Sequence, residues 1–280
     1  MSIKFEKLAY EYSPNTPFAH HALEDITLSI EENALTAIVG HTGSGKSTLV
    51  QHLNALLLPS EGKVHVFDHE IIAGEKPKGL KKLRSRVGLV FQFPEMQLFE
   101  ETVYKDVSFG PKNFGFSEEE INRNVQEALG LVGIDSSLWE RSPLDLSGGQ
   151  KRRVAIAGVL ASAPDVIVLD EPTAGLDPQG SKDMMKLFEK LKKEHHKTII
   201  MVTHDMEQVY DYADYVAYLE SGKLRYYGDP QTFFDDIEND DFVLPKMLYV
   251  QKLLKEHGLD LPLAKDVDDL ASNIKEALLK

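Results

Sequence analysis

Two glycine-rich turns about a hundred residues apart constrain this 280-residue chain more than any other feature. The first lies between an apolar segment expected to be a strand and an expected helix, and it reads Gly40-His41-Thr42-Gly43-Ser44-Gly45-Lys46-Ser47-Thr48. That context is typical of a phosphate loop. The second turn also precedes an expected helix, and it reads Leu146-Ser147-Gly148-Gly149-Gln150. A single nucleotide bound within one chain has no evident need of this second set of backbone donors.

The parts of the first turn have distinct tasks in phosphate binding. Its glycines let backbone N–H groups surround the β- and γ-phosphates, and the helix N-terminus adds a favourable dipole. Lys46 is placed to reach phosphate oxygens, and the Ser47 hydroxyl is a candidate ligand of Mg²⁺. A glycine-rich turn without a ligand is the alternative, which the lysine and hydroxyl in register disfavour. We therefore expect a nucleoside triphosphate, ATP or GTP, with Mg²⁺.

An acidic pair follows a buried-looking strand at residues 166–169. Open parallel sheets present ligand groups at the carboxyl ends of their strands. Asp170 is therefore a candidate to hold Mg²⁺ through water, and Glu171 a candidate to deprotonate the attacking water. Alone, such a pair is usually part of a solvated loop, and only the accompanying phosphate loop favours the catalytic interpretation.

Two further polar residues follow expected strands. Gln92 comes after residues 87–91, and its amide could reach Mg²⁺ or the attacking water. His204 comes after residues 198–202 and could donate to the γ-phosphate. Taken singly, a glutamine or histidine at a strand end is more often structural. The remaining histidines have no ligand-like neighbours in the sequence, and we interpret them as solvated or packing residues.

The second turn precedes a helix that opens with the basic run Lys151-Arg152-Arg153. A helix N-terminus favours anions, and three cations there strengthen the positive potential, although they oppose the usual macrodipole preference. A basic surface helix is the simpler alternative. The Ser-Gly-Gly turn favours anion binding, and we expect the anion to be a γ-phosphate held by a facing subunit.

Composition limits the possible partners. With 31 basic and 45 acidic residues the net charge is −14, which opposes a general nucleic-acid binder. No apolar run approaches the ~18–20 residues of a membrane span, and the first residues lack the apolar stretch of a secretory signal. The absence of cysteine fits a cytosolic location. We expect any membrane role to operate through a partner protein.

Hydrophobic periodicity predicts an α/β core interrupted by a helical insertion at about residues 94–163. Strands are expected at 3–12, 23–30, 35–39, 62–67, 87–91, 166–169 and 198–202. Helices are expected at 46–57, 80–86, 118–131, after Gly149, and at 179–194, 246–257 and 266–279. We place the main domain at residues 1–230 and a C-terminal extension at 231–280.

Five ordered motifs over roughly residues 1–230 resemble the ATP-binding-cassette (ABC) ATPase family. They are the phosphate loop, the residues around Gln92, LSGGQ, VIVLDEPTAGLDP at 166–178 and the later Thr203-His204-Asp205. The resemblance implies a P-loop NTPase core with an antiparallel β-subdomain, a helical subdomain insertion and a small C-terminal helical extension. It also implies a Q-loop at Gln92, a D-loop at Asp177, a switch role for His204 and adenine stacking on Tyr12. The D-loop reads Ala-Gly-Leu-Asp rather than the commoner Ser-Ala-Leu-Asp.

Residues 87–115 more narrowly resemble the Q-loop region of energy-coupling factor (ECF) transporter ATPases. Thr42 stands where the sister paralogue commonly has Asn, which is typical of the second paralogue. The resemblance implies two subunits closing head to tail around two ATP molecules. One chain's Ser147, Gly148, Gly149, Gln150 and Asp177 would then serve the ATP of the other.

The same resemblance implies three partners at the cytoplasmic face of the membrane: a second ATPase, expected to be a paralogue, a transmembrane scaffold protein and a substrate-binding membrane protein. The transported substrate would be a vitamin or similar micronutrient. Four apolar residues are candidates to contact the scaffold, with packing inside the helical insertion equally favoured: Phe93, Met96, Leu98 and Phe99.

Three other functions remain as alternatives. Cobalt and nickel uptake ATPases are close relatives of the ECF group. An ABC ATPase acting on nucleic acid or ribosomes usually has tandem cassettes or a coiled-coil insertion, which this chain lacks. A phosphate-loop kinase would leave LSGGQ without a purpose.

Overall fold

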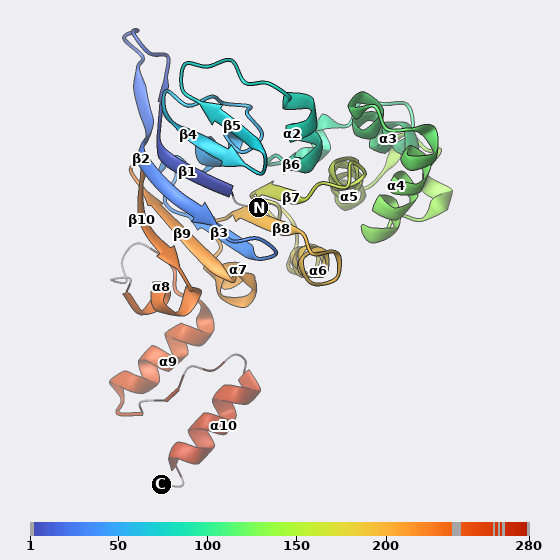
Figure 1. Ribbon diagram of the computed structural model, residues 1–280. Helices are drawn as coiled ribbons and strands as arrows, with labels where there is room; N and C mark the ends of the chain where they lie inside the picture. Colours follow the sequence, from blue (N-terminus) through green and yellow to red (C-terminus); the bar gives the residue numbers. More distant parts are fainter. Residues whose placement is uncertain (1–2, 237–241, 260, 263, 265–266, 279–280) are drawn as a thin grey trace.

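The structure is a computed structural model that describes residues 3–236, 242–259, 261–262, 264 and 267–278. Two β-sheets form the centre of the described part, with helices packed beside them (Figure 1). The smaller sheet is antiparallel and has the order β2-β1-β4-β5. Its strands are β1 (Ile3–Tyr12), β2 (His20–Ile30), β4 (Glu61–Val66) and β5 (His69–Ile72).

The larger sheet has the order β10-β9-β3-β8-β7-β6 and is parallel except for β10 at its edge. Its strands are β3 (Leu35–Val39), β6 (Val87–Val90), β7 (Val166–Asp170), β8 (Thr198–Val202), β9 (Tyr215–Glu220) and β10 (Lys223–Gly228). Every residue of β3, β7 and β8 is buried, as expected for parallel strands covered on both faces. Because these strands are parallel, the loops that follow β3, β6, β7 and β8 begin at one edge of the sheet.

Alternate residues of the buried strands face two different cores. Val168 of β7 packs in a core between the two sheets, which also contains Phe5 of β1 and Leu49 of the helix after the phosphate loop. Its neighbour Leu169 packs in the other core, with Phe188 and residues of the helical insertion. The parallel sheet therefore separates the antiparallel sheet from most of the helices.

The helical insertion lies to one side of both sheets (Figure 1). It contains α3 (Val103–Phe114), α4 (Glu118–Leu131) and α5 (Gly148–Leu160), with short 3₁₀ turns η1 (Pro94–Gln97), η2 (Ser136–Leu138) and η3 (Pro143–Asp145). A capping box between Ser117 and Glu120 starts α4 at the predicted residue. The apolar residues along one face of α4 and at its C-terminal cap are all buried: Ile121, Val125, Ala128, Leu129 and Val132.

The remaining helices cover the parallel sheet or form the C-terminal extension. They are α1 (Lys46–Gln51), α2 (Leu80–Arg86), α6 (Pro178–His195), α7 (Met206–Tyr212), α8 (Pro230–Asp236), α9 (Lys246–Glu256) and α10 (Val267–Leu278). No helix among the described residues is long and apolar enough to cross a membrane. Residues 266 and 279, predicted to belong to the last helix, lie outside the described part. The domain boundary near 230 and the limits 94–163 stay predictions.

The helix predicted at 46–57 is wrong in its second half. α1 ends at Gln51, whose carbonyl accepts hydrogen bonds from the N–H groups of both Leu56 and Leu57. Ala55 adopts a left-handed backbone conformation at φ 53°, which a helix cannot accommodate. His52 at this bend is completely buried, and its burial lowers its pKa to about 4, so the ring is neutral at pH 7.

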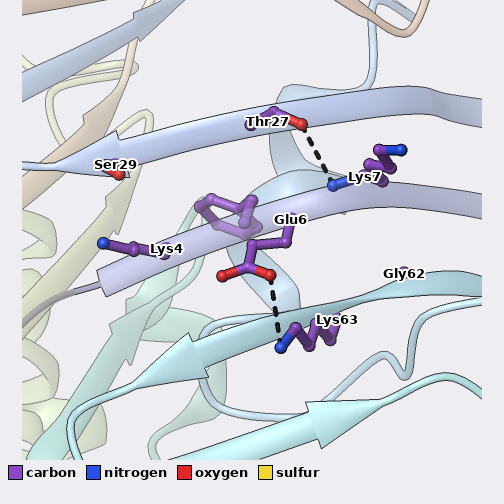
Figure 2. A pocket seen from close by; sticks show the side chains of 8 residues that line it. Lys4, Glu6, Lys7, Thr27, Ser29, Gly62 and Lys63 are labelled. Carbon is purple, nitrogen blue, oxygen red and sulfur yellow. Dashed lines mark hydrogen bonds and ion pairs between the residues drawn. The ribbon is translucent and has the colours of Figure 1, made fainter.

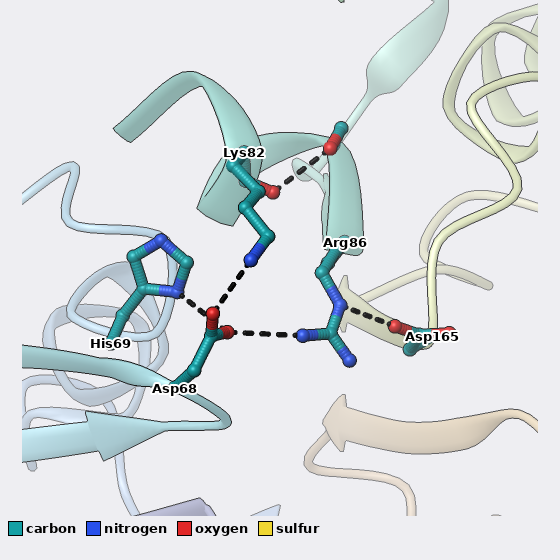
Figure 3. Close-up of polar contacts among 6 residues, drawn as sticks. Asp68, His69, Lys82, Arg86 and Asp165 are labelled. Carbon is teal, nitrogen blue, oxygen red and sulfur yellow. Dashed lines mark hydrogen bonds and ion pairs between the residues drawn. The ribbon is translucent and has the colours of Figure 1, made fainter. Parts of the chain in front are cut away.

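A polar cluster connects the hairpin of β4 and β5 to α2 and to the loop before β7 (Figure 3). Asp68 accepts from Lys82 at 2.6 Å and from Arg86 at 3.2 Å, and Arg86 also donates to Asp165 at 2.7 Å. The hydrogen bond from Lys82 lowers the pKa of Asp68 to about 2. This cluster holds the antiparallel sheet against one end of the parallel sheet.

An open groove of about 660 Å³ lies on the antiparallel sheet, along β1, β2 and β4 (Figure 2). Glu6 and Lys63 pair across it at 3.3 Å, and the Lys7 N–H donates to the Thr27 hydroxyl at 3.2 Å. Several polar groups of the groove are therefore already ion-paired or hydrogen-bonded to other residues of the sheet. None of the predicted site residues lines this groove.

Candidate active site

The loop between β3 and α1 is held in place by close backbone contacts. A Cβ atom on Gly40 would lie 2.1 Å from the Leu219 carbonyl oxygen, and one on Gly45 would lie 2.5 Å from that of Ala22. Both glycines also have positive φ angles, 148° and 98°. Only glycine is compatible with these positions. The tight packing of β2 and β9 against Gly40 and Gly45 therefore fixes the two ends of the loop.

Lys46 lies beside this loop and near two carboxylates. Its ammonium donates to the carbonyls of Gly40 at 2.7 Å and His41 at 2.8 Å. Burial lowers the pKa of Lys46, while the charges of Glu171 and Asp170 act in the opposite direction. The structure thus brings the predicted lysine and both predicted carboxylates together at one edge of the parallel sheet.

Asp170 ends β7 and is 9% exposed. Burial raises its pKa, while a hydrogen bond with Ser47 and the charge of Lys46 lower it. No cluster of three or more acidic or histidine ligands occurs in the described part of the chain. One hydroxyl and one carboxylate side by side still fit Mg²⁺, since this ion often takes few protein ligands and completes its shell with phosphates and water. The donor set present is therefore compatible with the predicted metal.

Glu171 and His204 form a direct pair. The Glu171 Oε1 atom lies 2.8 Å from Nδ1 of His204, and the glutamate side chain is 15% exposed, the histidine 76%. The Glu171 backbone is left-handed at φ 50°, while its N–H donates to the Val202 carbonyl of β8 at 3.0 Å. Such a conformation costs about 1–3 kcal/mol at a non-glycine residue and often marks a functional site. Both residues line an open pocket of about 640 Å³.

Two other predicted residues lie around this centre. Gln92 is exposed and follows β6, the strand next to β7. Its loop therefore starts at the same edge of the sheet as Glu171. The Tyr12 hydroxyl lies 3.1 Å from that of Thr48 in α1, and the ring packs edge-on against Tyr10. Tyr12 is thus tied to the helix that follows the phosphate loop. Its stacking on adenine and the roles of Gln92 stay predictions.

The second glycine turn forms the N-terminus of α5. Ser147 caps the helix by accepting from the Gln150 N–H, and the Gln150 side chain accepts from the Ser147 N–H at 3.0 Å. A Cβ atom added to Gly148 or Gly149 would meet no other atom within 4 Å. Packing within this chain therefore gives no reason for either glycine. Asp177 similarly caps α6 and accepts from the Gly180 N–H.

One residue of the basic run after this turn, Arg152, is not exposed as predicted. This residue is 3% exposed and forms a bidentate ion pair with Glu95, at 2.9 and 3.0 Å, and it also donates to the Ala174 carbonyl at 2.6 Å. Burial alone would raise the pKa of Glu95, but hydrogen bonds from Arg152 lower it below its usual range. The predicted contribution of Arg152 to a positive surface is wrong, because its charge is neutralised inside the protein.

Comparison with known proteins agrees with this architecture. A family model of ABC transporters matches residues 23–174. The chain is 50% identical to the energy-coupling factor transporter ATP-binding protein EcfA2 of Enterococcus faecalis, over 99% of both chains. It is 52% identical to the EcfA2 protein of Streptococcus agalactiae, over 94% of each. The chain belongs to the ABC transporter family. Within that family it groups with the energy-coupling factor ATP-binding proteins.

Solved structures support the same assignment. CbiO1 from Clostridium perfringens, part of the ABC transporter complex CbiONQ, matches with a TM-score of 0.74 and 42% identity, over 91% of this chain and 96% of that one. The ABC cassette MJ0796, in a post-hydrolysis state with ADP and Pi, matches with a TM-score of 0.72 and 30% identity, over 81% and 98%. The predicted fold class is confirmed, as is the prediction of an ATP-binding, ATP-hydrolysing subunit of the ECF type.

The ion pair of Arg152 predicts unequal effects for two neighbouring arginines. Arg152→Met should lower the free energy of unfolding by about 3–5 kcal/mol, because it leaves the Glu95 carboxylate without its buried partner. Arg153→Met is the matched control, since Arg153 is 37% exposed and 3.8 Å from Asp183, and its loss should cost less than about 1 kcal/mol. Urea unfolding of both variants measures the difference. Equal losses of unfolding free energy in the two variants would show that the buried ion pair contributes no more to stability than the exposed one.

Proposed function

We propose that this chain is one ATPase subunit of an ECF transporter that powers uptake of a vitamin or similar micronutrient. It would work at the cytoplasmic face of the membrane with a second, paralogous ATPase, a transmembrane scaffold protein and a substrate-binding membrane protein. The observation that carries the proposal is the identity of 50% to EcfA2 along 99% of both chains. CbiO1 of the CbiONQ complex is less similar, at 42% identity.

The residues of the sheet edge would bind ATP and hydrolyse it. We assign nucleotide binding to Tyr12 and to the loop and helix start that read Gly40, His41, Thr42, Gly43, Ser44, Gly45, Lys46, Ser47 and Thr48. Tyr12 would stack on the adenine, and Lys46 would exchange the carbonyls that it now contacts for phosphate oxygens. Ser47, Gln92 and, through water, Asp170 would hold Mg²⁺, which supplies positive charge beside the phosphates.

Glu171 would act as the general base. Its carboxylate takes a proton from water, the water oxygen attacks the γ-phosphorus, and the bond from that phosphorus to the bridging oxygen breaks, releasing ADP. Gln92 would orient the water. His204, 2.8 Å from Glu171, would hold the glutamate in position and donate to a γ-phosphate oxygen. Glu171 has a left-handed backbone and lines the open pocket.

The second glycine turn would serve the ATP of the partner subunit. Gly148 and Gly149 leave open space above the start of α5, where backbone N–H groups and the helix dipole favour a phosphate. The side chains of Ser147 and Gln150 already accept hydrogen bonds from each other's backbone N–H groups, so the turn needs no rearrangement to receive a phosphate. Asp177, which caps α6, would lie at the same subunit interface.

An exposed apolar patch after Gln92 would receive the membrane scaffold. Its side chains are Phe93, Met96 and Phe99, which are 45%, 84% and 63% exposed. Large apolar groups exposed within one short segment favour a protein partner. Leu98 does not belong to this patch, because it is partly buried and packs against the helical core. For Leu98 the packing alternative is therefore correct.

Replacing the proposed base should separate binding from hydrolysis. Glu171→Gln should keep ATP binding, lower the hydrolysis rate by about 10²–10⁴-fold, and stabilise the closed dimer in ATP. Phosphate release and gel filtration with ATP measure these effects. Glu189→Gln, on the exposed side of α6, is the control and should hydrolyse at the unmodified rate. Wild-type turnover by Glu171→Gln would disprove the assignment.

Mixed dimers test which nucleotide the second turn serves. Gly149→Asp should leave the fold intact, since its Cβ meets no atom of its own chain, but should place a carboxylate against the γ-phosphate bound by the partner. Hydrolysis should therefore fail at the partner's phosphate loop and persist at its own. Gly130→Asp, at another unobstructed glycine, is the control. Loss confined to the variant's own loop would contradict the shared site.

Purification from native membranes tests the proposed assembly. A tagged full-length chain should copurify with a second ABC ATPase and with membrane proteins, and mass spectrometry identifies them. Substituting Phe93, Met96 and Phe99 together by serine should reduce recovery of the membrane proteins while the second ATPase remains bound. A lone homodimer recovered without membrane proteins would refute the proposal, and a metal-uptake scaffold in the eluate would favour the cobalt or nickel alternative.

A further inference from the structure

A residue of the C-terminal extension lies against the phosphate loop. The ring of Phe242 stacks on the imidazole of His41, with ring centroids 5.5 Å apart and planes 7° from parallel. Phe242 is partly buried and also packs edge-on against Tyr218 of β9, at 5.3 Å. The extension therefore reaches back to the loop that begins the ATP site, about two hundred residues earlier in the sequence.

The same segment contacts the helix that follows His204. The Lys246 N–H, at the start of α9, donates to the Glu207 carboxylate in the first turn of α7 at 2.9 Å. Further along the extension, the Ala264 carbonyl accepts from the Tyr210 hydroxyl of α7 at 2.7 Å. The extension thus contacts both sides of the candidate site, the phosphate loop and the element after His204.

The contact with His41 matters because the turn there is exposed. His41, Thr42 and Gly43 all face solvent, and a Cβ on Gly43 would meet nothing within 4 Å. The His41 carbonyl is also one of the two acceptors of the Lys46 ammonium. An exposed glycine-containing turn loses considerable backbone freedom when it closes around phosphates. A stacked ring that restrains His41 beforehand reduces that loss.

We propose that Phe242 is a positioning residue for ATP, which restrains the phosphate loop through its stack on His41. This inference rests on the proposed role of Lys46 and its loop in ATP binding. The extension then contributes to nucleotide affinity from outside the cassette motifs. It acts on binding rather than on the chemical step, since Phe242 contacts the loop and none of the groups around Glu171.

Titration of the full-length chain with a fluorescent N-methylanthraniloyl ATP tests the proposal. Phe242→Leu keeps an apolar side chain but loses the ring, and it should raise the Kd about two- to tenfold, as expected for one aromatic contact. Phe242→Tyr keeps the ring and should retain the unmodified affinity. Val243→Ala, at a neighbour that is 88% exposed, is the control. In the assembled ATPase, Phe242→Leu should raise KM and leave kcat unchanged.

A double-mutant cycle distinguishes positioning from simple packing. In a His41→Ala background, Phe242→Leu should cause no further loss of affinity, because the stack is already absent. An equal loss in both backgrounds, or wild-type affinity of Phe242→Leu with an unchanged unfolding midpoint, would overturn the inference. Lys46→Ala separates the proposed ATP site from the role of Phe242. If Lys46→Ala still binds the ATP analogue, the proposed site itself is wrong. If Lys46→Ala fails to bind while Phe242→Leu binds with unchanged affinity, only the role of Phe242 is wrong.

Discussion

The buried guanidinium of Arg152 joins three segments on which the candidate site depends. It lies in α5, five residues after Ser147, and its bidentate pair with Glu95 holds the turn that follows Gln92. It also donates to the carbonyls of Pro172 and Ala174, directly after Glu171. A buried charge without its partners carries a large desolvation penalty. Because all three contacts would be lost together, the three segments are expected to move as one unit.

This unit links the segment after Gln92 both to the start of α5 and to the loop that carries Glu171. The exposed Phe93 and Met96 flank Glu95, so the proposed scaffold protein would also displace Arg152 if it displaced them. That displacement would move the start of α5, which we propose to face the partner's nucleotide, and would pull on the loop that carries Glu171. Specific hydrogen bonds of Arg152 therefore hold the three segments together. Coupling among these segments does not require any further chain of contacts.

The sequence alone predicted the parts of the fold that local signals determine. The strands β1, β3 and β8 and the helices α2 and α4 have the expected bounds, since alternation, glycine turns and the Ser117 cap are local. The strands β5, β9 and β10 were not predicted. β5 and β10 have short, partly exposed patterns, and β9, although its four central residues are buried, also acquires meaning only through pairing. Likewise the motifs indicated the site, but Arg152 and Glu95 are 57 residues apart, and no local pattern shows that the arginine is buried.

The two phosphate-facing elements differ in how far the chain has prepared them. Around Ser147 the capping box is complete and the glycines are open, so a ligand finds the turn already formed. Lys46, by contrast, contacts two loop carbonyls that it would have to leave in order to bind phosphate as proposed. In the proposed site, the phosphate loop would thus be the element that rearranges, and the turn supplied by the partner would be the rigid one. Ordering the phosphate loop would then be the step on which the proposed closure depends, and a contact that restrains the loop would favour closure as well as binding.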